Sequence, residues 1–191
     1  TCVTLHHLCA HGQQGDQVLF SILEKNGACV KRNPFQVSGK VRSLYEVDLE
    51  DCPDLGPILF VLASQCERET VFLHTDRLRM KESDRLESMR LELKRLGIFM
   101  EVKDDRAIVY PGRLCGNVQL DGHHDHRIVM ALAIAAVCAD GPITIGDKEG
   151  YDAERCHRQI FHSHHWRRHG VADSIFIGCH VCRSAGYAHD G

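Results

Sequence analysis

Residues 79–97 read RMKESDRLESMRLELKRLG, and this stretch predicts a helix with a charged site at its start. Apolar residues recur in it at helical spacing, at Leu86, Met89, Leu93 and Leu96. Charged residues fill most of the intervening positions, as in an amphipathic helix with one buried face. We therefore predict a helix over residues 82–96 that ends at Gly97, a residue type common at helix C-termini.

Lys81, Glu82 and Arg85 gather at the predicted start of this helix. Glu82 and Arg85 are three residues apart and so share a helix face, and Lys81 immediately precedes them. The free backbone N–H groups of a first turn favour anions, so this group suits a phosphate or a carboxylate. The alternative is an ordinary charged first turn in which Glu82 and Asp84 interact with the helix dipole, and the charge pattern alone favours this alternative.

The composition predicts a soluble globular protein. The chain has 191 residues, of which 43% are apolar, and a net charge of −3 from 23 basic and 26 acidic residues. This balance predicts no nucleic-acid partner, and no apolar run is long enough to predict a membrane span. The sequence begins TCVTLHHLCAHG, without an initiator methionine or a targeting pattern, so we expect a fragment of a longer protein.

Ten cysteines are scattered along the chain, and those before residue 150 lie in apolar runs. A disulfide framework would suit an extracellular protein, but no secretory signal precedes these residues. We therefore predict buried thiols and a protein of the reducing cytoplasm.

The same series of elements is predicted twice: a helix, two strands, a third strand, a buried helix and a closing strand. In the first copy these elements cover residues 17–27, 28–31, 35–38, 45–49, 55–66 and 70–74. In the second copy they cover residues 82–96, 98–103, 107–110, 118–120, 128–139 and 143–145. The period is 70 or 71 residues, read from Gly27 to Gly97 and from Asp54 to Asp125, and it suits an α/β supersecondary module.

A polar cluster that contains an aspartate precedes the buried helix of each copy. It consists of Pro53 and Asp54 in the first copy and of HDHR at residues 124–127 in the second. Because both clusters stand at helix N-termini, we hypothesise that successive modules converge on one anion-binding site. The alternative is that Asp54 and Asp125 only cap their helices.

Residues 151–191 lack the apolar periodicity of the repeat, which predicts a domain at residues 1–150 followed by an irregular tail. The tail holds seven of the fourteen histidines, together with Cys156, Cys179 and Cys182. Residues 179–182 form one CxxC pair, whereas a structural zinc site usually needs two ligand pairs at regular spacing. We predict no metal site and keep a metal-binding tail as the alternative.

Four segments, in order, resemble the second half of the 5-enolpyruvylshikimate-3-phosphate synthase family. They are residues 14–16 with LEKNGA, residues 52–55 with the apolar helix after them, RMKESDRL at residues 79–86, and DHRIVMALA at residues 125–133. Together they cover roughly residues 12–147. The resemblance implies an α/β fold of two domains, each an inside-out barrel of three βαβαββ units, with the active site in the cleft between them. About two of those six units are expected in this chain.

The resemblance also implies a reaction. The family transfers the enolpyruvyl group of phosphoenolpyruvate to the 5-hydroxyl of shikimate 3-phosphate, in the shikimate pathway of aromatic amino acid biosynthesis. Inorganic phosphate is released, and neither a metal nor an organic cofactor takes part. Asp54 matches the carboxylate that acts as base toward the 5-hydroxyl, and Glu82 matches the acid that protonates the methylene carbon of phosphoenolpyruvate.

Further residues match groups that bind the two anionic substrates. Lys81 matches a lysine that contacts shikimate 3-phosphate, while Arg85 and Arg127 match arginines that hold the carboxylate and phosphate of phosphoenolpyruvate. Asp125 and His126 flank Arg127, and we expect them to orient it.

Two parts of the family pattern have no clear match. The family's N-terminal half is absent, so we expect at most weak substrate binding and no turnover from this chain alone, unless a separate chain supplies that half. A lysine near the family C-terminus is also unmatched, with Arg158 the nearest candidate and Lys148 another.

Two other functions compete with this hypothesis. The first is a truncated scaffold without catalytic activity that binds metal through the tail. The second is the related transferase that acts on UDP-N-acetylglucosamine, against which the KESDR and DHR segments argue.

Overall fold

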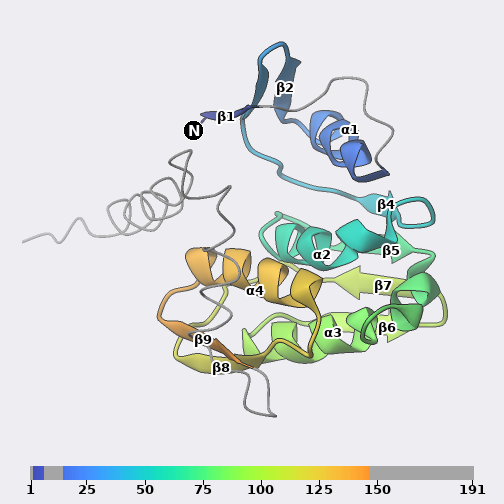
Figure 1. The fold of residues 1–191 in the computed structure, drawn as a ribbon, viewed down its shortest axis with the longest axis vertical. Helices are drawn as coiled ribbons and strands as arrows, with labels where there is room; N and C mark the ends of the chain where they lie inside the picture. Colours follow the sequence, from blue (N-terminus) through green and yellow to red (C-terminus); the bar gives the residue numbers. More distant parts are fainter. Residues whose placement is uncertain (1, 7–14, 147–191) are drawn as a thin grey trace, which may run out of the picture.

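The computed structural model describes residues 2–6 and 15–146, which Figure 1 draws in colour. The predicted tail at residues 151–191, with Arg158 and the CxxC pair, lies outside the described residues, as does Lys148. Within the described ranges, no helix combines the length and the apolar character that crossing a membrane requires.

The predicted repeat is present in the structure. The first unit consists of α1 (Val18–Lys25), β2 (Cys29–Arg32), β3 (Phe35–Ser38), β4 (Glu46–Asp48), α2 (Gly56–Ser64) and β5 (Thr70–Leu73). The second unit has the same order, with α3 (Arg85–Arg95), β6 (Met100–Lys103), β7 (Arg106–Val109), β8 (Val118–Asp121), α4 (His126–Cys138) and β9 (Ile143–Gly146). The α/β class and the element order predicted from the sequence are therefore confirmed.

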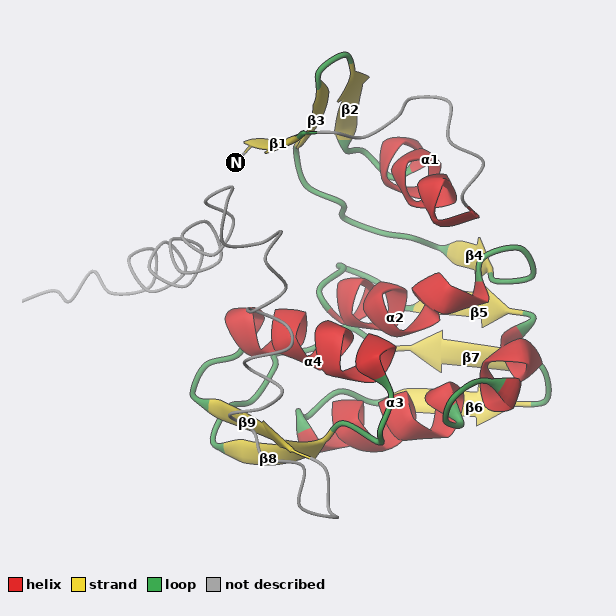
Figure 2. Ribbon diagram, in the orientation of Figure 1, coloured by secondary structure: helices red, strands yellow, loops and turns green. Residues whose placement is uncertain are grey.

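The strands pair within and between the two units. In each unit a buried helix connects two parallel strands, since β4 pairs with β5 on either side of α2, and β8 pairs with β9 on either side of α4. The second unit's hairpin, β6 with β7, joins the first unit because β7 lies antiparallel to β5. Strands of both units therefore share a four-stranded sheet in the order β4-β5-β7-β6 (Figure 2).

The N-terminal strand β1 (Cys2–Leu5) is not predicted by the sequence pattern. It lies antiparallel to β3 and completes a three-stranded sheet in the order β1-β3-β2. Its residues are mostly exposed, so they lack the alternation of buried and exposed positions that identifies a strand. Pairing with β3, rather than burial of one face, defines this strand.

Helices α2, α3 and α4 pack against one another; α2 and α3 lie against the four-stranded sheet, and α4 lies against β9 (Figures 1 and 2). Their apolar faces form one core, whose fully buried side chains include Leu59, Phe60, Phe72, Leu86, Leu93 and Leu132. Phe60 of α2 and Phe72 of β5 meet edge to face, with ring centroids 4.7 Å apart. The core thus joins helices and strands of both units.

Helix α3 begins at Arg85, three residues later than predicted. Asp84 is its N-cap, and its Oδ1 accepts a hydrogen bond from the Glu87 backbone N–H at 3.0 Å. Lys81 and Glu82 therefore lie in the segment before the helix and not in its first turn, so the predicted shared helix face of Glu82 and Arg85 is wrong. The N-cap aspartate makes the helix begin later than its apolar spacing predicts, because that spacing carries no signal of a cap.

The prediction of buried thiols is correct only in part. Cys52 and Cys66 are buried, whereas Cys2, Cys29, Cys115 and Cys138 are exposed. Cys2 and Cys29 lie on outer strands of the three-stranded sheet, where an apolar neighbourhood in sequence does not guarantee burial.

Replacement of a core leucine of α3 tests the packing of this helix. Leu93 is fully buried, so Leu93→Ala should lower the free energy of unfolding by about 2–5 kcal/mol through lost contacts and a residual cavity. Leu91→Ala on the same helix is the matched control, because Leu91 is 39% exposed and should cost well below about 1 kcal/mol. Urea unfolding followed by circular dichroism measures both. Equal losses would contradict the orientation of α3.

Candidate active site

Three cationic side chains surround the carboxylate of Asp54, just before α2. Lys81 Nζ lies 3.1 Å from Asp54 Oδ1, and Arg85 Nη1 donates a hydrogen bond to the same oxygen at 2.7 Å. Arg127 Nη2 lies 3.8 Å from Asp54 Oδ2. Asp54 stands in a 3-10 turn (Pro53–Leu55) that leads into α2, while Arg127 stands at the start of α4. The two helix N-termini that the repeat predicts as a pair therefore do converge.

A buried ion pair lies beneath this cluster. Arg85 Nε donates to Asp125 Oδ2 at 2.7 Å, and only 3% and 0% of the two side chains are exposed. Ser83 Oγ donates to the same oxygen at 3.2 Å, and Asp125 Oδ1 accepts from the Arg127 backbone N–H at 2.9 Å. Asp125 is thus both the N-cap of α4 and the partner of an arginine from α3.

The charges in this cluster shift one another's pKa values. Burial opposes ionisation of Asp54, but hydrogen bonds from Lys81 and Arg85 outweigh it and lower the pKa of Asp54 below its ordinary value. Burial opposes ionisation of Asp125 in the same way, and the hydrogen bonds from Arg85 and from the Arg127 backbone N–H lower its pKa too. Both carboxyl groups are therefore ionised at neutral pH.

Glu82 and His126 form a second pair beside the first. His126 Nδ1 lies 2.9 Å from Glu82 Oε2, and both side chains are more than half exposed. One carboxylate oxygen each of Glu82 and Asp125 and one ring nitrogen of His126 lie within 4.8 Å of one another, so this pair adjoins the buried one. His126 was expected to orient Arg127, but the contact that the structure shows for its ring is with Glu82.

Two residues of the cluster were not selected as site residues from the sequence. Asp16, in the 3-10 turn before α1, has Oδ2 3.3 Å from Arg127 Nη1, and Ser83 contacts Asp125. Both lie within the segments that carry the family resemblance, in QGD and KESDR, so their position in these motifs is the signal that identifies them.

Two groups of described side chains place possible metal-ligand atoms within 4.8 Å: Asp48 with Glu50 and His74, and Glu82 with Asp125 and His126. In the second group Asp125 forms an ion pair with the Arg85 guanidinium, whose positive charge disfavours a divalent cation at this place. In the first group Asp48 Oδ1 lies 2.7 Å from His74 Nδ1 and accepts the Glu50 backbone N–H. The expectation that no metal or organic cofactor takes part stays a prediction.

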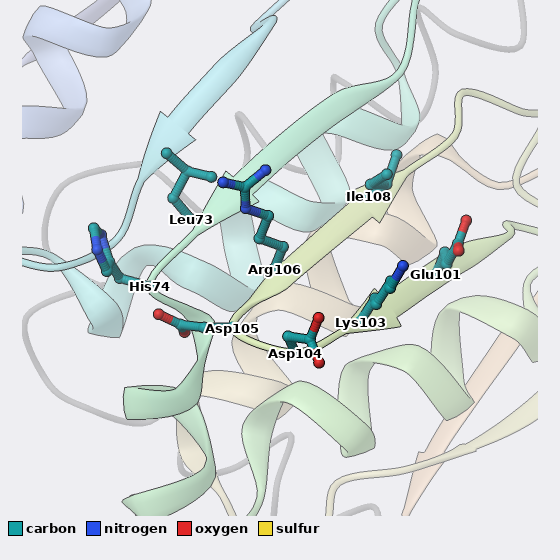
Figure 3. A pocket seen from close by; sticks show the side chains of 8 residues that line it. All are labelled: Leu73, His74, Glu101, Lys103, Asp104, Asp105, Arg106 and Ile108. Carbon is teal, nitrogen blue, oxygen red and sulfur yellow. The ribbon is translucent and has the colours of Figure 1, made fainter.

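A hollow of about 710 Å³ lies on the face of the four-stranded sheet that the helices do not cover (Figure 3). It is lined by Leu73, His74, Glu101, Lys103, Asp104, Asp105, Arg106 and Ile108. On β7, Arg106 and Ile108 alternate with the buried Ala107 and Val109, so the hollow lies opposite the core. None of the predicted site residues lines it.

The structure brings together the predicted site residues that it describes. Asp54, Lys81, Arg85, Asp125 and Arg127 are linked through ion pairs. Glu82 and His126 adjoin them through Asp125. Arg158, the remaining predicted site residue, lies outside the described residues.

Comparison with known proteins gives a family match over most of the chain. Residues 1–153 match the family described as EPSP synthase (3-phosphoshikimate 1-carboxyvinyltransferase). The 3-phosphoshikimate 1-carboxyvinyltransferase of Natronomonas pharaonis is 39% identical over 143 residues, which are 73% of this chain and 32% of that protein. The enzyme of the same name from Clostridioides difficile is 38% identical over 139 residues, or 71% of this chain and 32% of that protein.

A solved structure agrees with these matches. EPSP synthase from Acinetobacter baumannii superposes with a TM-score of 0.57 and 28% sequence identity, over 66% of this chain and 34% of that one. The chain therefore spans about a third of the length of the relatives it matches. Taken with the repeat and the charged cluster, the match over residues 1–153 shows that this chain belongs to the EPSP synthase family.

Proposed function

We propose that this chain forms one wall of an active site that transfers the enolpyruvyl group of phosphoenolpyruvate to the 5-hydroxyl of shikimate 3-phosphate. The observation that carries the proposal is the group around Asp54, where Lys81, Arg85 and Arg127 lie within 4 Å of one carboxylate. A site that gathers three cations suits two substrates that each carry a phosphate and a carboxylate. The relatives' printed name, 3-phosphoshikimate 1-carboxyvinyltransferase, denotes the same transfer.

The exposure of the three cations gives them different parts in substrate binding. The side chains of Lys81 and Arg127 are each 30% exposed, so their charged ends are within reach of an entering anion. Arg85 is only 3% exposed and lies beneath Asp54, so its main contribution is positive charge from below the surface. By the family resemblance, Lys81 contacts shikimate 3-phosphate, while Arg127 and Arg85 hold phosphoenolpyruvate, with Arg85 acting from below the surface.

Asp54 and Glu82 supply the proton transfers that the reaction needs. Asp54 is ionised at neutral pH and takes the proton of the 5-hydroxyl. Its cationic partners make it a weak base in the free protein, and an anionic substrate that draws Lys81 and Arg127 toward itself raises the pKa of Asp54. Glu82 protonates the methylene carbon of phosphoenolpyruvate, and His126, 2.9 Å away, holds its carboxyl group in place.

The chain spans about a third of its relatives, and a site with one wall needs a second one, so we propose that the opposite wall comes from a segment outside this chain. We propose that an N-terminal half, as in the full-length relatives, supplies that wall, and that the protein works in the cytoplasm without metal or organic cofactor. The domain at residues 1–150 then provides Asp54, Glu82 and the three cations.

Titration of the two substrates tests this proposal. Phosphoenolpyruvate and shikimate 3-phosphate are titrated calorimetrically into the chain, alone and mixed with the N-terminal half of a full-length relative. We expect weak binding alone and tighter binding with turnover on mixing. Arg127→Ala should weaken phosphoenolpyruvate binding about 10-fold to 150-fold, the worth of a charge-assisted hydrogen bond. Glu82→Gln should lower turnover about 10²-fold to 10⁴-fold with little change in affinity.

Matched controls separate the site from general charge effects. Arg113→Ala removes an arginine whose side chain is 81% exposed and paired with Asp140, and it should leave both affinities unchanged. Glu101→Gln removes an exposed carboxylate on β6 in the same way. If the mixture neither binds nor turns over the substrates, or if the controls lose as much as the site variants, the proposed function is wrong.

The buried pair predicts a pH-dependent loss of stability. Asp125→Asn leaves Arg85 buried without this charged partner and should lower the free energy of unfolding by about 3 kcal/mol at pH 7. Because the pKa of Asp125 in the folded protein lies below its ordinary value of 3.8, its contribution is present above that pH and is lost as the pH falls through the folded pKa. The difference between wild type and variant should therefore shrink below about pH 3.8.

Urea unfolding between pH 7 and pH 3 measures this difference. Asp76→Asn is the control, since the Asp76 side chain is 64% exposed and its removal should change stability by less than about 0.5 kcal/mol. A difference for Asp125→Asn that is absent at pH 7, or that does not shrink in acid, would show that the pair does not carry the stability assigned to it.

A further inference from the structure

Helix α3 holds the loop between β8 and α4 at both of its ends. At the far end of the loop, Arg85 binds Asp125. At the near end, Glu92 accepts the Asp121 backbone N–H and contacts His123. Arg85 and Glu92 are seven residues apart, which is two helical turns and about 10.5 Å along one face of α3. Side chains of one helix therefore bind both ends of the loop, residues 121–125.

Glu92 is a fully buried carboxylate whose two oxygens are both engaged. Oε2 accepts the Asp121 N–H at 3.0 Å and Nη1 of Arg95 at 3.1 Å. Oε1 lies 3.0 Å from Nε2 of His123. Burial of a carboxylate is costly unless hydrogen bonds compensate it, and here two of the three partners belong to the loop. These contacts therefore fix the loop to the helix.

The loop has a backbone that needs such support. His123 and His124 both have a positive φ, of 51° and 53°, in the left-handed region that side chains other than glycine adopt at a cost. The Asp121 carboxylate accepts the His123 N–H at 2.9 Å, and the Asp125 N–H donates to the Gly122 carbonyl at 3.0 Å. This path of the chain places Asp125 at the N-cap of α4, where it binds the Arg127 N–H.

We propose that Glu92 is a positioning residue for the candidate active site, acting through Asp121 and His123 on Asp125 and Arg127. The inference rests on the proposed function, because it concerns the same cluster of charges. Glu92 itself touches neither Asp54 nor its cations in the described contacts. Its effect on the site passes through the loop: when the near end is released, the left-handed residues relax and Asp125 no longer meets Arg85 in the same place.

Three variants of the full chain test the proposal. Glu92→Leu keeps much of the side-chain volume but removes both acceptors. Glu92→Gln is the conservative variant, because its amide oxygen still accepts the Asp121 N–H and its NH₂ group donates to His123 in the other tautomer. His123→Asn removes the contact with Glu92 while keeping a residue that tolerates positive φ. Glu87→Gln is the control on the same helix, where the carboxylate is paired with Arg90.

The first readout is amide hydrogen exchange by NMR, which needs no ligand. Glu92→Leu and His123→Asn should accelerate exchange at residues 121–127 about tenfold or more beyond any change at β5 and β7, which report the stability of the core. Glu92→Gln should stay within about threefold of wild type, and Glu87→Gln should be unchanged. If Glu92 contributed only to overall stability, its replacement would accelerate amide exchange in the loop and in the core by the same factor. That outcome, or unchanged exchange in both disruptive variants, would overturn the proposal.

The second readout is titration of phosphoenolpyruvate, followed through the amide signals of residues 125–127. Glu92→Leu and His123→Asn should weaken the wild-type affinity about tenfold, and Glu92→Gln should restore most of it. Unchanged affinity in the two disruptive variants would contradict the proposal. If the wild-type chain shows no response to phosphoenolpyruvate even when completed by the N-terminal half, the proposed function fails, while the exchange readout still decides whether Glu92 positions the loop.

Discussion

The ion pair between Arg85 and Asp125 is the contact on which the arrangement of this protein depends. It connects the first residue of α3 to the N-cap of α4, and both groups are almost completely buried. A buried ion pair recovers its desolvation cost only when further hydrogen bonds satisfy its atoms. Here Asp54, Ser83 and the Arg127 backbone N–H supply them. The same bonds that stabilise the pair therefore collect the charged groups of the candidate site.

Carboxylates of the protein offset part of the positive charge of the site. Asp54 lies beside all three cations, and Asp16 provides a second carboxylate for Arg127. Under the proposed function, an entering phosphate or carboxylate competes with these carboxylates for the cations and thereby changes the basicity of Asp54. The proposed binding and proton transfer are then linked through these charges.

The sequence predicted the repeat well, because helical spacing, glycines and aspartates recur at the same offsets in both units. It also predicted the cluster, since Asp54, Lys81, Arg85 and Arg127 stand in motifs with a known counterpart. It could not predict individual contacts outside the repeated motifs. The bond between Glu92 and His123 joins residues 31 positions apart, and neither stands out in its own segment. The start of α3 was misplaced for a local reason, since apolar spacing does not report a cap.

The shared four-stranded sheet has a consequence for how such a protein divides. The parallel pair β4 and β5 and the hairpin β2 and β3 belong to one unit but lie in different sheets, and β5 gains its second neighbour only from the next unit. A single unit cut out by its sequence boundaries would expose the free edge of β5, and exposed edges invite pairing with other chains. The sequence period therefore does not coincide with a closed sheet, because a piece of the chain that keeps both neighbours of β5 has to include strands of two periods.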